Sequence, residues 1–91
     1  MIALFFNDLE RNRKALEQAQ RNDDFASIRN LAHSIKGAAG VFHADVVVAV
    51  AQRLELAGKN QDGPSVQRAL PELLNALGAL AGVLRKARKA A

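Results

Sequence analysis

The amino-acid sequence predicts an all-α protein, an up-down antiparallel four-helix bundle that spans residues 1–91 as a single domain. Alanine and leucine together supply 30 of the 91 residues and proline only two, a composition that favours helix over sheet. The apolar residues recur at three- and four-residue spacings along four segments, and no segment reads as a strand. Because the connections between these segments are short, neighbouring helices are expected to run antiparallel.

Two apolar stripes separated by a polar turn predict the first two helices. The first stripe consists of Ile2, Phe5, Phe6, Leu9, Leu16 and Ala19. It ends before the polar residues 21–24, in which Asp23 or Asp24 can accept a hydrogen bond as the N-cap of the next helix. The second stripe consists of Phe25, Ile28, Ala32, Ile35, Ala39 and Phe42.

Two further stripes predict the third and fourth helices. Near His43 the chain is expected to break or bend, because Asp45 is a new N-cap candidate. We expect Gly58 to be the C-cap of the third helix and Pro64 to occupy the first position of the fourth. Pro71 cannot donate a helical hydrogen bond, so we expect a kink or a separate first turn there. The stripes are Val47, Val50, Ala51 and Leu54, then Val66, Leu70, Leu73, Leu77, Leu80 and Leu84.

The composition excludes several classes of function. Without cysteine the chain has no disulfide, thiolate metal site or cysteine nucleophile. No apolar run approaches the roughly 18 residues that span a bilayer, and no secretory signal is recognisable, so we expect a cytoplasmic protein without direct membrane contact. The net charge is +4, and four of the thirteen basic residues lie in the last seven positions, where they complement a helix dipole. With no Trp or Tyr to stack on bases, we expect no nucleic-acid binding, and we expect the isolated domain to be a monomer.

The second predicted helix presents a histidine on a face without large side chains. On a helical wheel with Ile28 at the centre of the core stripe, His33 lies about 140° away, facing solvent, and Lys36 lies at about 80°, within reach of it. Four small residues lie around the histidine at roughly 120–180°: Ala26, Gly37, Gly40 and Ala44. Each glycine within a helix costs about 1 kcal/mol relative to alanine. Because Gly37 and Gly40 lie opposite the core stripe, this cost indicates that another protein approaches His33 closely.

The surroundings of His33 narrow its chemistry. Metal binding needs further ligands, and no His, Asp or Glu follows three or four residues later. A general base needs an orienting carboxylate and a concave pocket, neither of which the sequence predicts. A nucleophile toward phosphorus needs exposure, a neutral ring nitrogen and a nearby cation, which Lys36 supplies. An inert histidine on a helical docking module without chemistry is the alternative.

Residues 31–40, Leu-Ala-His-Ser-Ile-Lys-Gly-Ala-Ala-Gly, resemble the A-H-x-[LI]-K-G motif of the histidine-containing phosphotransfer (HPt) domains of multistep phosphorelays. The resemblance extends over nearly the whole chain, including Leu54-Glu55 in the third helix. It implies that His33 is the catalytic, phospho-accepting residue, that Lys36 stabilises the phosphoryl group, and that Gly37 leaves room beside it. The partner-docking residues would be Ala26, Gly37, Gly40 and Ala44. His43 stands where family members commonly have glycine, and we interpret it as structural or incidental.

The resemblance implies a phosphoryl carrier without an ATP site rather than an enzyme. His33 would accept the phosphoryl group from the aspartate of one response-regulator receiver domain and pass it to that of another. No cofactor is expected in this chain, and Mg²⁺ is expected on the partner receiver. The alternative within the family is the phosphotransfer domain of a chemotaxis-type histidine kinase, which carries a similar H-S-I-K-G stretch and is labelled by a kinase catalytic domain. A free-standing carrier and the cytosolic part of a membrane-bound hybrid sensor kinase are both compatible with the sequence.

Overall fold

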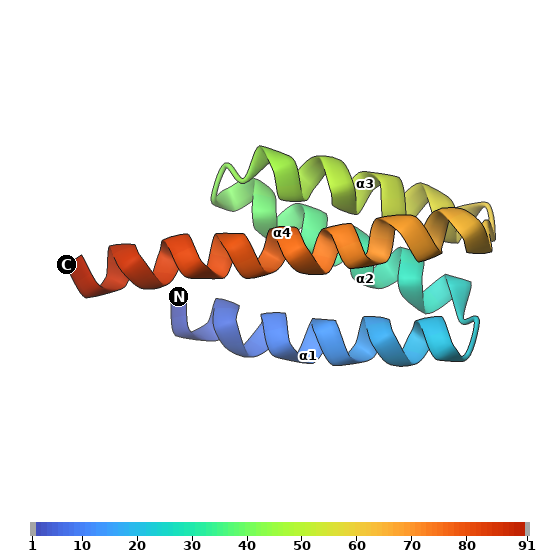
Figure 1. Cartoon of the computed structure of the whole chain (residues 1–91), viewed down its shortest axis with the longest axis horizontal. Helices are drawn as coiled ribbons and strands as arrows, with labels where there is room; N and C mark the ends of the chain where they lie inside the picture. The colour runs from blue at the N-terminus through green and yellow to red at the C-terminus, as the bar shows by residue number, and fades with distance from the viewer. Residues whose placement is uncertain (1, 91) are drawn as a thin grey trace.

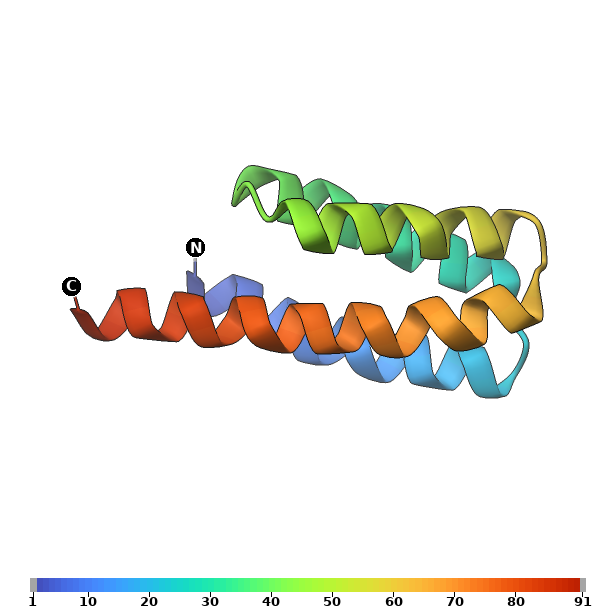
Figure 2. The same cartoon turned by 45° about the horizontal axis from the view of Figure 1, so that its top comes forward.

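The computed structural model describes the backbone of residues 2–90 and the side chains of residues 9–86. It contains four helices: α1 (Ile2–Arg21), α2 (Phe25–Val41), α3 (Asp45–Lys59) and α4 (Gly63–Ala90). Three-residue turns join them, so that successive helices run antiparallel (Figure 1). Helices α1 and α3 each pack against α2 and α4, and Figure 2 shows the α2–α3 hairpin lying over the α1–α4 pair. The predicted all-α four-helix bundle is therefore confirmed.

The core consists of apolar side chains from all four helices, most of them at the predicted stripe positions; Ala57, Ala69 and Ala81 were not predicted, and the predicted Phe42 and Leu84 are only half-buried. The largest fully buried side chains are Leu16, Ile28, Leu54 and Leu73, one from each helix. Each of them contributes about 1.5–3 kcal/mol through removal of apolar surface from water. The predicted core residues Ile2, Phe5 and Phe6 lie outside the described side chains. Within the described residues, no helix has the length and apolarity needed to cross a membrane.

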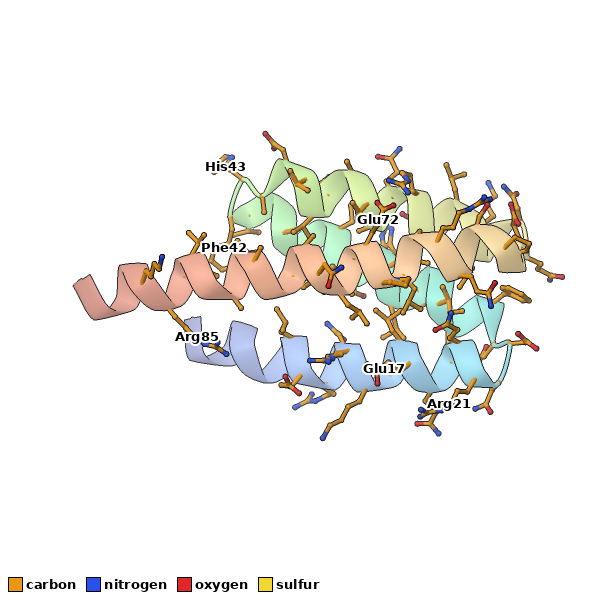
Figure 3. All side chains as sticks on the ribbon, in the orientation of Figure 1. Glu17, Arg21, Phe42, His43, Glu72 and Arg85 are labelled. Carbon is orange, nitrogen blue, oxygen red and sulfur yellow. The ribbon has the colours of Figure 1, made fainter. Side chains whose placement is uncertain are left out.

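The three turns share one backbone conformation that ends each helix. The middle residues Asp23, His43 and Gln61 have φ of 52°, 55° and 53°, in the left-handed region. In each turn the following residue donates a backbone hydrogen bond to a carbonyl five residues earlier, as in a Schellman motif. These bonds are Asp24 to Ala19 (2.9 Å), Ala44 to Ala39 (3.1 Å) and Asp62 to Ala57 (2.9 Å). The predicted break at His43 is thus present, and Figure 3 places His43 at the end of the bundle where α2 and α3 meet.

The helix starts are capped unequally. Asp24 caps α2 as predicted, because its carboxylate accepts hydrogen bonds from the Ser27 backbone N–H at 3.2 Å and from the Ser27 hydroxyl at 2.7 Å. Asp62 does the same with Ser65 before α4. The N-cap of α3 is Ala44, without a side-chain hydrogen bond, so the prediction that Asp45 caps this helix is wrong. The left-handed residue at 43 makes the helix start one residue earlier than the side-chain pattern suggested.

Two predictions about helix ends are wrong: Gly58 as the C-cap of α3, and a separate first turn before Pro71, whereas the kink given as the alternative at Pro71 stays a prediction. Gly58 is buried within α3, and the C-cap is Asn60. A Cβ at Gly58 would lie 2.9 Å from the Arg29 backbone nitrogen and 3.0 Å from the Phe25 carbonyl oxygen, so this glycine permits close approach of α2 and α3. Helix α4 continues through Pro71 without a separate first turn (Figure 1). Pro71 itself faces solvent, while the neighbouring stripe positions stay packed in the core.

The left-handed turn predicts that His43→Gly stabilises the protein. Glycine adopts a φ of 55° without the steric conflict of a Cβ, so we expect a gain of up to about 1 kcal/mol in the free energy of unfolding by urea. Ser34→Gly, in the exposed middle of α2, is the control and should lose about 0.5 kcal/mol. A lower urea midpoint for His43→Gly would show that the imidazole makes a stabilising contact that outweighs the turn geometry.

Candidate functional site

His33 lies on the solvent side of α2. Its neighbours Ala32 and Ile35 are buried in the core, whereas the His33 side chain is 67% exposed. Its Nδ1 is hydrogen-bonded to the carboxylate of Glu55 on α3, with the Glu55 Oε2 atom 2.9 Å away. The second ring nitrogen, Nε2, has no partner in the described part of the chain. The imidazole therefore presents Nε2 to any approaching protein.

Glu55 joins His33 and Lys36 in one network across the α2–α3 interface. Lys36 Nζ donates to Glu55 Oε1 at 2.7 Å, and the Lys36 and Glu55 side chains are 30% and 21% exposed. The hydrogen bond from Lys36 is the largest of the influences that lower the pKa of Glu55, and it outweighs the partial desolvation that raises it. The hydrogen bond to His33 lowers this pKa further. Glu55 is consequently a carboxylate at neutral pH.

The charged Glu55 determines which tautomer of the neutral His33 is favoured. A carboxylate can only accept hydrogen bonds, so the ring proton belongs on Nδ1. Nε2 then carries an exposed lone pair, the form that a nucleophile toward phosphorus requires. Lys36 is held beside the imidazole by the same carboxylate. This arrangement combines a nucleophile, an orienting base partner and a cation.

Sequence reasoning missed Glu55 as a site residue and wrongly expected no orienting carboxylate for His33. The two residues are 22 positions apart and lie on different helices. The available signal was the hairpin register, since His33 precedes Ala44 by eleven residues and Glu55 follows Ala44 by eleven. In an antiparallel hairpin, positions equidistant from the turn lie opposite each other.

The small residues of α2 leave open space on its outer face. A Cβ built on Gly37 or Gly40 meets no atom within 4 Å, so neither glycine serves close helix packing. Ala26 is likewise exposed. Ala44, which the helical wheel placed on this face, lies beyond the end of α2 and packs half-buried against the core, so that placement is wrong. The outer face is therefore defined by Ala26, Gly37 and Gly40, and its role in docking is a prediction.

Other polar groups lie away from this network. The guanidinium of Arg53 on α3 donates to both carboxylate oxygens of Glu72 on α4 at 3.0 and 3.2 Å, and this pairing lowers the pKa of Glu72 (Figure 3 labels Glu72). His43 lies in the α2–α3 turn rather than beside His33 (Figure 3). Among the described side chains, no three His, Asp or Glu residues are grouped to hold a metal ion.

The open face predicts that Gly40→Gln separates stability from function. Glutamine forms helices better than glycine and meets no atom there, so stability should stay equal or rise by up to about 1 kcal/mol. The longer side chain should hold a partner away from His33 and slow phosphoryl transfer. A thermal melt and a transfer time course on one variant measure both quantities. A sharply lowered melting temperature, or unchanged transfer, would contradict this account of the face.

The carboxylate shared by His33 and Lys36 predicts that Glu55→Gln slows transfer on the order of a hundredfold. In buried Ser-His-Asp triads the wrong histidine tautomer costs more, but His33 is exposed to solvent. Lys36 can only donate, so it should bind the amide oxygen and turn the amide N–H toward His33 Nδ1. The ring proton would then move to Nε2 and block its lone pair. Glu55 is a positioning residue, and imidazole ¹⁵N chemical shifts should report the tautomer change.

The matched control for Glu55→Gln is Glu72→Gln, which breaks the Arg53 pair elsewhere. It should lower stability without changing transfer or the His33 tautomer. Because the folded-state pKa of both carboxyls is lowered, their stabilising effect is present above the usual glutamate pKa and is lost as the pH falls through the lowered value. Both variants should therefore approach wild-type stability in acid. Equal transfer rates in the two variants would contradict the positioning role.

Comparison with known proteins gives one family. A family model described as the Hpt domain matches residues 1–83, which is 83 of the 91 residues. The match includes His33, Lys36 and Glu55 and all three turns. No curated protein and no solved structure matches the chain.

Proposed function

The chain belongs to the Hpt domain family, whose members perform histidine phosphotransfer in phosphorelays and interact with response-regulator receiver domains, and from this membership we propose a specific role for it. The His33 Nε2 atom accepts a phosphoryl group from the aspartyl phosphate of one receiver domain. It then passes that group to the aspartate of a second receiver. The single observation that carries this proposal is the exposed imidazole of His33, whose Nδ1 is held by Glu55 and whose Nε2 has no partner among the described residues.

The chemical step is an in-line exchange at phosphorus. The Nε2 lone pair forms the N–P bond as the bond between phosphorus and the aspartate oxygen breaks, and the leaving electron pair returns to the aspartate carboxylate. The imidazole becomes cationic, with its proton still on Nδ1, and the charged Glu55 stabilises that cation. The Lys36 ammonium, bound to the same carboxylate as His33, is the cation that neutralises the phosphoryl oxygens. Transfer to the second receiver reverses these steps.

The chain's part in this reaction is positioning and charge neutralisation, which dominate catalysis of phosphoryl transfer. We propose that it needs no cofactor of its own and that the Mg²⁺ is bound by the partner receiver. Within this proposal the domain is a carrier without ATP chemistry and operates in the cytoplasm, where it meets its receivers.

The test is a comparison of phosphoryl donors. The domain is incubated either with a receiver domain carrying ³²P-aspartyl phosphate or with a histidine-kinase catalytic domain and ATP. Acid-labile, alkali-stable label from the receiver, followed by discharge to a second receiver, supports the proposal. Label from the kinase domain alone would instead assign the chemotaxis-type role. A chain that takes label from neither donor would be a docking module without chemistry.

A further inference from the structure

A basic hollow lies beside the His33 network on the α2–α3 face. It has a volume of about 240 Å³ and is lined by Arg29, Lys36, Gln52, Glu55, Leu56 and Lys59. Arg29 precedes His33 by four residues and so lies one helical turn away along α2. Three cationic side chains and one carboxylate line this hollow, which gives it a net charge of +2 at neutral pH.

The surplus positive charge belongs to Arg29 and Lys59. Lys36 and Glu55 neutralise each other through their hydrogen bond at 2.7 Å. Arg29 and Lys59 are exposed, and neither forms an ion pair within the described part of the chain. On the other side of His33, the outer face of α2 carries only the uncharged Gly37 and Gly40. The histidine therefore lies between a positive end and a neutral end of one surface.

We propose that the basic hollow receives an acidic side chain of the receiver domain and thereby fixes the orientation in which that receiver docks over His33. This inference rests on the proposed function. Two exposed cations without an ion-pair partner among the described residues select a carboxylate, and this acidic side chain is distinct from the carboxylates that would hold the receiver's Mg²⁺, whose charge the ion compensates. Opposite potentials accelerate encounter and suppress wrong orientations. Leu56, which is 50% exposed and lines the same hollow, offers an apolar contact for the docked partner.

The proposal predicts a charge effect specific to this end of the surface. The double variant Arg29→Glu with Lys59→Glu should lower kcat/KM for transfer from a phosphorylated receiver by about tenfold or more, mainly through KM. The matched control is Lys14→Glu with Lys86→Glu, which makes the same change in net charge at exposed positions of α1 and α4. It should change kcat/KM by less than about twofold. Raising the salt concentration should slow wild-type transfer and affect the Arg29/Lys59 variant much less.

Four outcomes distinguish this inference from the proposed function. Phosphoramidate labels histidine without a protein partner, so a wild-type chain that takes label from phosphoramidate and from a receiver upholds the proposed function. Equal kcat/KM in the Arg29/Lys59 variant and the charge-matched control would then overturn the docking inference alone. A different result would be that the wild-type hollow binds inorganic phosphate saturably while the Arg29/Lys59 variant transfers at the wild-type rate. That result would assign the hollow to a free anion and overturn the docking inference. Rescue of the variant by an acidic-to-lysine change on the receiver surface would support it directly.

Discussion

A His33→Gln chain is expected to take up no label from a phosphorylated receiver domain, whatever the incubation time. The glutamine amide has no nucleophilic lone pair comparable to that of Nε2, and the remaining Glu55 and Lys36 only position and neutralise charge. Because the His33 side chain is exposed and lies outside the core, the helical circular dichroism signal and the melting temperature should change little. Autoradiography after transfer, with circular dichroism on the same samples, measures both.

His43→Gln is the control for this loss. His43 lies in the α2–α3 turn and has no equivalent carboxylate and cation arrangement among the described residues, so its variant should accept label at the wild-type rate. Label that survives in His33→Gln and disappears in His43→Gln would transfer the assignment to His43.

Gly58→Ala is expected to give the largest loss of stability, a net decrease of about 1–2 kcal/mol in the free energy of unfolding. The added Cβ would lie 2.9 Å from the backbone nitrogen of Arg29 and 3.0 Å from the carbonyl oxygen of Phe25, and backbone atoms cannot rotate away as a side chain can. This conflict outweighs the gain of about 1 kcal/mol that alanine normally brings within a helix. Thermal and urea unfolding measure the difference.

The same variant should also slow phosphoryl transfer. Gly58 lies one turn beyond Glu55, so a wider gap between α2 and α3 lengthens the contact between Glu55 and His33. Gly78→Ala is the control, since its Cβ meets no atom within 4 Å, and it should be neutral or stabilising. If the Gly58 and Gly78 variants were equally stable, the close approach of the two helices would not depend on this glycine.

Local sequence patterns predicted the fold because helix periodicity and turn polarity are local properties. The apolar stripes identified the core residues of all four helices, and the exposed position of His33 followed from the same wheel. The wheel failed at Ala44 because it was extended past a left-handed turn that no helix periodicity encodes. Such a turn depends on the φ of a single residue, His43.

The missed features depend on contacts between helices. Gly58 resembled a C-cap because glycine commonly ends helices. Its actual role, close contact with the backbone at Phe25 and Arg29, involves residues about 30 positions earlier and leaves no local signal. Glu55 carried no signal of its own, since its role exists only when α3 lies against α2 at one register. A separate first turn was one of two expectations at Pro71, but α4 is continuous there, with Leu70 and Leu73 packed in the core on either side. Each miss is therefore a consequence of tertiary packing.

The turn at residues 42–44 also has a kinetic consequence. The His33 network lies within one helical hairpin, formed by α2 and α3. Its contacts join residues of consecutive helices, 19 and 22 positions apart in the sequence. Hairpins with such local contacts form early and quickly, within microseconds to milliseconds in helical proteins. Because α2 and α3 also share the most extensive helix–helix interface of the bundle, we expect amide hydrogen exchange to show them as the most slowly opening unit. Local opening within α1, which has the least extensive interfaces of the four helices, would then leave the contacts among His33, Lys36 and Glu55 in place.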